Sequence, residues 1–205
     1  MIKIEIATCS DLQNIVSLHI AAFEGFFLTS LGDKFLYLLY QEFVLQNDSI
    51  CLVAKDDTAK VVGFAIGTLA PNVFFKRALV KRWYSFFIAA VPSLVKNPAF
   101  VCKKMVSALF YRGDMPAIKD TTNPILLSSI GVDPASKGMG VGKSLINSFS
   151  INAQKRGADC IYLTTDQENN DYVHKFYLSN GFQVDGTLHK PGGRLMYRYI
   201  KVLRD

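Results

Sequence analysis

The chain has 205 residues, of which 50% are hydrophobic and 20% charged, the composition of a single folded domain able to bury one core. Its four cysteines include no C-x-x-C pair and its three histidines are scattered, which argues against a disulfide framework and against a metal site. The first residues lack the layout of a signal peptide, and the longest apolar run, residues 83–95, is too short to span a bilayer. We therefore expect one cytoplasmic domain over residues 1–205, without a transmembrane segment.

The first third of the chain predicts a strand, two helices and a β-hairpin. Polar and apolar residues alternate at the start, and Ser10 and Asp11 can cap the helix that follows. Gly25 and Gly32 then bracket a loop with more aromatic surface than a linker needs. The expected elements are residues 2–7, 12–23, 35–43, 49–55 and 60–69.

Residues 71–120 form a basic, helix-like segment. Residues 58–113 contain nine basic and no acidic residues, within a chain of net charge +6. Apolar side chains spaced by four over residues 75–91 predict a helix, and Asn97 begins a second helical piece. The simplest interpretation is a helical pair with solvated lysines, while a lid over an acceptor site and a docking surface for an anionic partner stay open. A nucleic-acid partner is disfavoured, because the segment carries no recognised motif.

Residues 124–132 predict a buried strand that leads through a glycine-rich turn into an amphipathic helix. Glycines let the backbone bring N–H groups close to an anion, and the helix directs the positive end of its dipole to the same place. Gly138, Gly140 and Gly142 therefore predict a phosphate site. The spacing excludes a Walker A loop, since Lys137 stands where that loop needs a glycine, and it also excludes the dinucleotide fingerprint.

Two motifs resemble those of the GNAT superfamily of N-acetyltransferases. The run from Lys137 to Gly142 is similar to the family's acyl-CoA-binding motif, with lysine where arginine or glutamine is usual. Asn170 to Phe182 is similar to the family's Asn-x-x-Ala-x-x-Leu-Tyr-(x)3-Gly-Phe segment, with Phe176 in place of leucine. The resemblance covers residues 124–200. It implies a single α/β (α+β) domain, a mixed central sheet of about six to seven strands flanked by helices, with residues 71–120 inserted between the third and fourth strands.

The resemblance also implies acetyl-CoA as cosubstrate, with no metal. Amides of the glycine turn would hold its pyrophosphate, and the end of the fourth strand would pair with the pantetheine arm. Without the resemblance, Ile130 and Val132 are plain core residues and Asn170 is a helix N-cap. The implied cofactor-binding residues are Ile130, Val132, Lys137, Gly138, Met139, Gly140, Val141, Gly142, Lys143, Asn170 and Phe176.

The resemblance also makes Tyr177 the catalytic candidate, as the acid that protonates the leaving thiolate. A phenol of ordinary pKa near ~10 is protonated at neutral pH, where a thiol of pKa ~8.5 leaves as thiolate. Without the resemblance, Tyr177 is a half-buried helix aromatic. The fourth strand offers only serines where many relatives have a glutamate base. The base is left open among Glu24, Asp166, His174, His19 and a water chain.

We therefore expect direct attack of a primary amine on acetyl-CoA in a ternary complex, without a covalent enzyme intermediate. The basic segment and the aromatic loop favour a small anionic acceptor, such as an amino sugar or sugar nucleotide, near Glu24, Phe26 and Phe27. A protein or peptide N-acetyltransferase and a non-catalytic acyl-CoA-binding module are the alternatives. Whether the chain forms a homodimer is left open.

Overall fold

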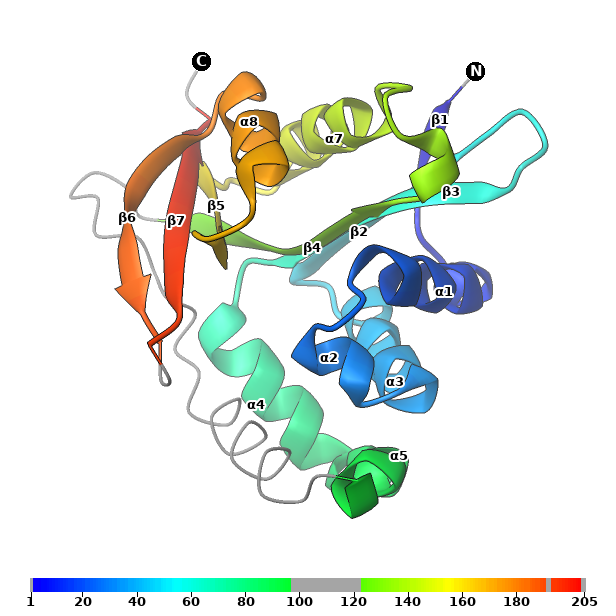
Figure 1. Ribbon diagram of the computed structural model, residues 1–205. Helices are drawn as coiled ribbons and strands as arrows, with labels where there is room; N and C mark the ends of the chain where they lie inside the picture. The colour runs from blue at the N-terminus through cyan, green and yellow to red at the C-terminus, as the bar shows by residue number, and fades with distance from the viewer. Residues whose placement is uncertain (1, 97–122, 191–192, 204–205) are drawn as a thin grey trace.

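The computed structural model describes residues 2–96, 123–190 and 193–203, and its centre is a seven-stranded sheet (Figure 1). The strands follow the order β1-β2-β3-β4-β5-β7-β6, and all neighbours are antiparallel except β4 and β5. Fold class and strand number are as the sequence predicts. The strands are β1 (Lys3–Ile6), β2 (Ser49–Lys55), β3 (Val61–Thr68), β4 (Pro124–Val132), β5 (Cys160–Asp166), β6 (Gln183–His189) and β7 (Leu195–Val202).

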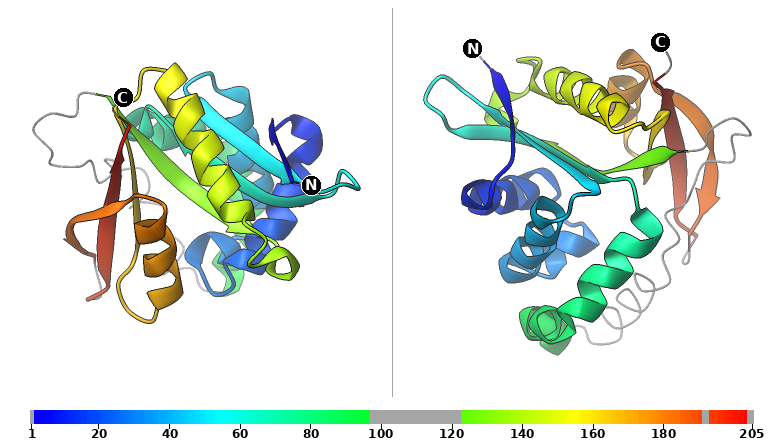
Figure 2. Two further views of the ribbon diagram at one scale, coloured as in Figure 1. Left: turned by 90° about the horizontal axis from the view of Figure 1, so that it is seen from above. Right: turned by 180° about the vertical axis from the view of Figure 1, so that it is seen from behind.

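Helices cover both faces of this sheet. The first three helices lie on one face and α7 crosses the other, as both views of Figure 2 show. The inner strands are buried on both sides: in β2, Cys51 and Val53 join the core under the first helices, while Leu52 and Ala54 join the core under α7. The described helices are α1 (Leu12–Ala22), α2 (Phe27–Ser30), α3 (Asp33–Leu45), α4 (Pro71–Lys81), α5 (Trp83–Lys96), α7 (Val141–Lys155) and α8 (Asp171–Ser179), with 3-10 turns η1 (Cys9–Asp11) and η2 (Pro134–Ser136).

The insertion between β3 and β4 begins with α4 and α5, which extend away from the sheet (Figure 1). The sequence predicts one helix over residues 75–91, but the structure breaks it at Arg82, whose φ of −125° and ψ of 32° are not helical. The break turns Phe86 inward against Phe35, with ring centroids 5.0 Å apart, so Trp83, Phe87 and Val91 of the stripe face outward. Phe75, which lies in α4, packs against the core instead. The expected second piece, from Asn97, lies outside the described residues.

The strands β4 and β5 pair at their first residues and then diverge, and the candidate site described below lies where they diverge. They pair only where Pro124, Ile125 and Leu126 face Cys160, Ile161 and Tyr162. Beyond Leu126, β3 is the one described strand beside β4, while β7 is the one described strand beside the rest of β5. Along β3 the register shifts between Ile66 and Gly67, which leaves Ser128 as an extra residue in β4, a β-bulge that bends the strand.

Candidate active site

The edge of β4 that faces away from β3 has no strand partner beyond Leu126 among the described residues. Ile130 and Val132 lie on this segment, and both are half-buried. Backbone N–H and C=O groups on an unpaired strand edge can pair with an extended ligand as they would with another strand. The pantetheine arm of coenzyme A is such an extended, amide-containing chain.

The glycine turn at the start of α7 leaves room for an anion. Gly138 and Gly140 have φ values of 84° and 77°, a left-handed conformation that glycine adopts at little cost, and Gly140 is the N-cap of α7. A Cβ added at either glycine would meet no atom within 4 Å. Open space therefore lies directly before the positive end of a helix of 15 residues.

Gly142 has a different role from its two neighbours. A Cβ at this residue would lie 3.0 Å from Cε2 of Phe176 and 3.7 Å from Cγ2 of Val132. Gly142 thus lets the end of β4, the first turn of α7 and α8 meet closely. The structure brings together three predicted cofactor-binding residues here, with the ring of Phe176 packed against the backbone of α7.

Two lysines flank the turn, and one has a partner that the sequence does not indicate. The ammonium of Lys137 lies 4.1 Å from the centroid of the Tyr172 ring on α8, a cation–π contact that connects the turn to that helix. Lys143 and Met139 are exposed, whereas Val141 is buried in the core beneath α7. No motif position marks Tyr172, so sequence reasoning missed this contact.

Asn170 holds the end of β5 to the start of α8. Its side-chain amide donates to Thr165 Oγ1 at 2.8 Å and to the carbonyl of Asp166 at 3.0 Å. It occupies the N-cap position of α8, but its side chain makes no capping hydrogen bond to that helix. Asn170 therefore fixes the angle at which α8, and with it Tyr177, follows β5.

Tyr177 lies in an aromatic cluster between α8 and β7. Its side chain is 7% exposed, and its ring centroid lies 5.3 to 5.5 Å from those of Phe176, Phe182 and Tyr199. Burial raises the pKa of Tyr177 above the ordinary value of a phenol, so the hydroxyl keeps its proton across the neutral range. Within the described ranges this hydroxyl has no hydrogen-bond partner, and it is available to a ligand.

Two of the candidate bases are already engaged. His174 Nε2 lies 2.9 Å from the carbonyl of Gln167, to which it must donate, and its Nδ1 accepts from the hydroxyl of Tyr199 at 2.8 Å. Asp166 forms an ion pair with Arg194, which lies on the other side of a small hollow at the ends of β5 and β7. Neither group is free to take a proton from an amine.

A third candidate, His19, belongs to a buried chain of polar groups that reaches β4. His19 Nδ1 lies 2.6 Å from the hydroxyl of Tyr40 on α3, and that hydroxyl is also hydrogen-bonded to the side chain of Ser129. His19 Nε2 is buried without a partner in the described part of the chain. Burial lowers the pKa of His19 to about 4, so the ring is neutral at pH 7 and is a poor base. Sequence reasoning missed Tyr40, because nothing local to it indicates a polar partner.

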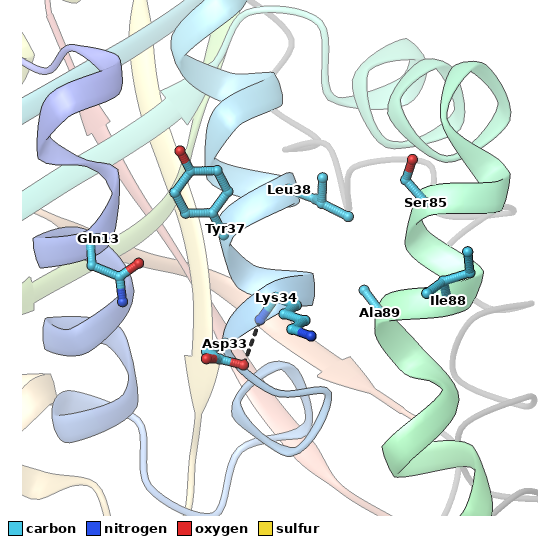
Figure 3. A pocket seen from close by; sticks show the side chains of 8 residues that line it. All are labelled: Gln13, Asp33, Lys34, Tyr37, Leu38, Ser85, Ile88 and Ala89. Atoms are coloured by element: carbon cyan, nitrogen blue, oxygen red, sulfur yellow. Dashed lines mark hydrogen bonds between the residues drawn. The ribbon is translucent and has the colours of Figure 1, made fainter.

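Two pockets in the described parts of the chain, one between α3 and α5 and one at the ends of β5 and β7, include none of the three predicted acceptor residues. Glu24 is exposed and Phe26 is 46% exposed beside Phe23, whereas Phe27 packs against the core. A pocket of about 420 Å³ lies between α3 and α5 and contains none of the predicted site residues (Figure 3). Among described residues, no cluster of three or more His, Cys, Asp or Glu side chains could hold a metal ion.

The sequence matches the acetyltransferase (GNAT) family model over residues 12–182. A search of curated proteins finds no significant match. Among solved structures, a putative acetyltransferase of the GNAT family from Desulfovibrio desulfuricans is similar at a TM-score of 0.65, with 13% identity and 100% of each chain covered. Another acetyltransferase structure has 21% identity and a TM-score of 0.62, with 98% of this chain and 100% of that chain covered.

A spermidine N-acetyltransferase chimera from Vibrio cholerae and hSSAT is similar at a TM-score of 0.60, with 16% identity and coverage of 98% of this chain and 95% of that chain. At these identities the solved structures share the fold with this chain, and the acceptor of one does not carry over to another. The family model, which spans most of the chain, is the finding that bears on activity.

Proposed function

This chain belongs to the acetyltransferase (GNAT) family and is an N-acetyltransferase that uses acetyl-CoA, and we propose that its acceptor is the primary amine of a small anionic molecule, such as an amino sugar or sugar nucleotide. The observation that carries the proposed cofactor site is the open glycine turn before α7, next to the unpaired edge of β4. This arrangement offers amide donors for a pyrophosphate at one end and a strand edge for a pantetheine arm at the other.

Different residues of the chain would bind different parts of acetyl-CoA. Backbone amides from Gly138 to Lys143 bind the pyrophosphate, with Lys137 and Lys143 adding attraction to its oxygens. The backbone of Ile130 and Val132 would hold the arm in an extended form, and the N–H of Val132 would polarise the thioester carbonyl. Acetyl-CoA supplies the activated acyl group on its thioester.

Tyr177 would act on the leaving sulfur. Its hydroxyl keeps its proton because burial raises its pKa, and it has no competing partner among the described residues. It therefore donates a hydrogen bond to the thiolate as the tetrahedral intermediate collapses. Its pKa lies above that of a free thiol, so this hydrogen bond, rather than an early full transfer of the proton, is what the phenol contributes.

The state of the candidate bases supports an acceptor of modest basicity. A lysine-type amine of pKa ~10.4 is neutral about one time in ~10³ at pH 7, equivalent to roughly 4–5 kcal/mol, and so needs a strong base. His174 and Asp166 are engaged, and His19 has a pKa of about 4. An amine of lower pKa can be deprotonated by a weaker base, and a water chain to the exposed Glu24 can carry its proton.

An acceptor screen tests this proposal. Release of free CoA thiol is measured with amino sugars, sugar nucleotides, amino acids, polyamines and peptides at the same concentrations. We expect turnover with small anionic amines, with a KM that rises with ionic strength because screening weakens their attraction to a basic protein. Faster turnover with peptides would replace the proposal with protein acetylation. Binding of acetyl-CoA without turnover on any amine would leave a non-catalytic acyl-CoA-binding module.

A further inference from the structure

The helix α5 is apolar on the side that faces solvent as well as on the side that faces the core. Its inner side is ordinary: Phe86, Ala89 and Ala90 are 7% exposed or less, and Phe86 packs against Phe35 of α3. Residues 83–95 contain no charged side chain. A helix that is apolar all round is normally covered on every side.

The outward side of α5 carries a row of large apolar side chains. Residues at 83, 87, 91 and 95 are spaced by one turn of helix, and residues 84 and 88 widen the row to an arc of roughly 140° at ~100° per residue. The exposed fractions are 64% for Trp83, 62% for Tyr84, 49% for Phe87, 51% for Ile88, 40% for Val91 and 80% for Val95. Scattered apolar residues are normal on a surface, but a continuous arc of this kind indicates an interaction site.

The groove between α3 and α5 continues this apolar surface. It has a volume of about 420 Å³, and Tyr37, Leu38, Ile88 and Ala89 supply apolar atoms to its lining. Figure 3 shows the side chains of Leu38 and Ala89 on either side of the gap between the two helices. Ile88 belongs both to the groove and to the exposed arc, so the two form one surface.

Positive charge lies next to this surface. Lys76 and Lys81 on α4 are exposed, and neither forms an ion pair with a described residue. The two arginines of the same segment do have partners, because Arg77 pairs with Asp48 and Arg82 pairs with Glu42. Residues 71–96 contain no acidic side chain, and Asp33 and Lys34 in the groove balance each other, so the two lysines leave the surface net positive.

We propose that α4 and α5 dock on the surface of an anionic phospholipid bilayer. The outward face of α5 would enter the boundary between headgroups and acyl chains, where Trp83 and Tyr84 match the preference of large aromatic side chains for that depth. Lys76 and Lys81 would contact lipid phosphates. The helix lies along the surface, and no helix in the described ranges is long and apolar enough to cross a membrane.

The charge distribution decides between a bilayer and a second copy of the chain. Two copies that met through α5 would bring the lysines of both α4 helices into one interface. The groove supplies one acidic side chain there, Asp33, and Lys34 lies directly beside it, so the lysines of α4 would not be offset. A bilayer that contains anionic lipids supplies both the apolar medium and the opposite charge. The proposal does not depend on the proposed cofactor site, because none of these residues belongs to it.

Trp83 is the one tryptophan of the chain, so its fluorescence reports directly on the proposed contact. The whole protein is mixed with phosphatidylcholine vesicles that contain either none or a third of phosphatidylglycerol. With phosphatidylglycerol at low salt, we expect flotation with the vesicles, a blue shift of Trp83 emission and quenching by brominated acyl chains. Vesicles of phosphatidylcholine alone should bind much more weakly.

Matched variants separate the two components of the binding. Phe87→Asn with Val95→Asn should abolish the blue shift, whereas Ile151→Asn, which changes an exposed apolar residue of α7, should leave it unchanged. Lys76→Gln and Lys81→Gln should each weaken binding about fivefold at low salt, and Lys155→Gln on α7 should not. Thermal stabilisation by acetyl-CoA should be the same in all variants, which checks their fold and keeps this test separate from the proposed function.

Three results would overturn the proposal. One is the absence of flotation and of a blue shift with anionic vesicles. Another is equal binding to vesicles with and without phosphatidylglycerol, which would remove the role of the lysines. The last is a wild-type dimer in sedimentation that Phe87→Asn with Val95→Asn converts to monomer, since a second copy would then cover this face.

Discussion

At the scale of single residues, the aromatic cluster around α8 contains two tyrosines with opposite relations to their neighbours. The hydroxyl of Tyr199 is bonded to His174 at 2.8 Å, whereas that of Tyr177 has no partner in the part of the chain that the structure describes. Both pKa values are raised, with burial as the main cause. The hydroxyl of Tyr199 therefore stabilises the fold, whereas that of Tyr177 is free for the catalytic role that we propose.

Tyr177→Phe should lower kcat by on the order of 10²-fold, within the range for a lost general acid, with little change in the KM for acetyl-CoA. The free energy of unfolding should change little, because no described hydrogen bond is lost. The matched control is Tyr199→Phe, which leaves His174 Nδ1 unpaired and should cost about 1 kcal/mol of stability with near wild-type turnover. An unchanged kcat in Tyr177→Phe would return this residue to a purely structural role.

His19 makes the stability of the fold depend on pH. Its pKa is about 4 in the folded protein, against an ordinary value near 6.5, because the buried ring is costly to charge. Between these values the unfolded chain binds a proton that the folded chain does not. The contribution of His19 to the free energy of unfolding is therefore fully present above pH ~6.5. As the pH falls toward 4, the protein loses up to about 3 kcal/mol of this stability.

Denaturant unfolding between pH 4 and pH 8 checks this expectation. The lowered pKa values of Asp11, Asp56 and Asp133 add their own acid sensitivity, so the informative quantity is the difference between wild type and His19→Gln. The wild-type curve should fall more steeply from pH 6.5 to 4 than the curve of His19→Gln. His189→Gln, at an exposed position, should follow wild type. Parallel curves for wild type and His19→Gln would contradict the buried neutral ring.

At the scale of elements, the sequence predicts best what is encoded locally. The strand, turn and helix around Gly138 to Gly142 are read from neighbouring residues, and the structure has β4, the glycine turn and α7 where the pattern predicts them. The fifty-residue insertion is also visible as an interruption between two strands. These features depend on periodicity and on turn residues, which act over a few positions.

The contacts that the sequence does not indicate join distant parts of the chain. Phe176 against Gly142, Lys137 over Tyr172, and the chain from His19 through Tyr40 to Ser129 each depend on how two or more elements meet. The orientation of α5 is missed for the same reason. Periodicity identifies an apolar stripe, but the break at Arg82 decides which side of the helix reaches the core.

At the scale of the whole molecule, the sheet consists of two parts that share a short seam. The strands β1 to β4 form one part and β5 to β7 the other. Among the described residues, the two parts are hydrogen-bonded only where Pro124 to Leu126 of β4 pair with Cys160 to Tyr162 of β5. The helix α7 packs mainly on the first part and α8 belongs to the second. A ligand that lies along β4 and reaches α8 would contact both parts.

Acetyl-CoA should therefore stabilise the whole fold. At 100 times its Kd a ligand adds about 2.7 kcal/mol, and at roughly 2–4 °C per kcal/mol for a chain of this size the Tm should rise by about 5–10 °C. Amide exchange should slow in residues 127–132 and 138–143.

Gly140→Val should abolish this rise in Tm, because its side chain would fill the open space where we propose that the pyrophosphate binds. Gly32→Val is the matched control: Gly32 is the N-cap of α3 with a φ of 88° and open space around it, so it carries the same backbone strain away from the cofactor. Gly142→Val is less informative, since it also disturbs Phe176. An undiminished rise in Gly140→Val, measured against Gly32→Val, would remove the glycine turn from the cofactor site.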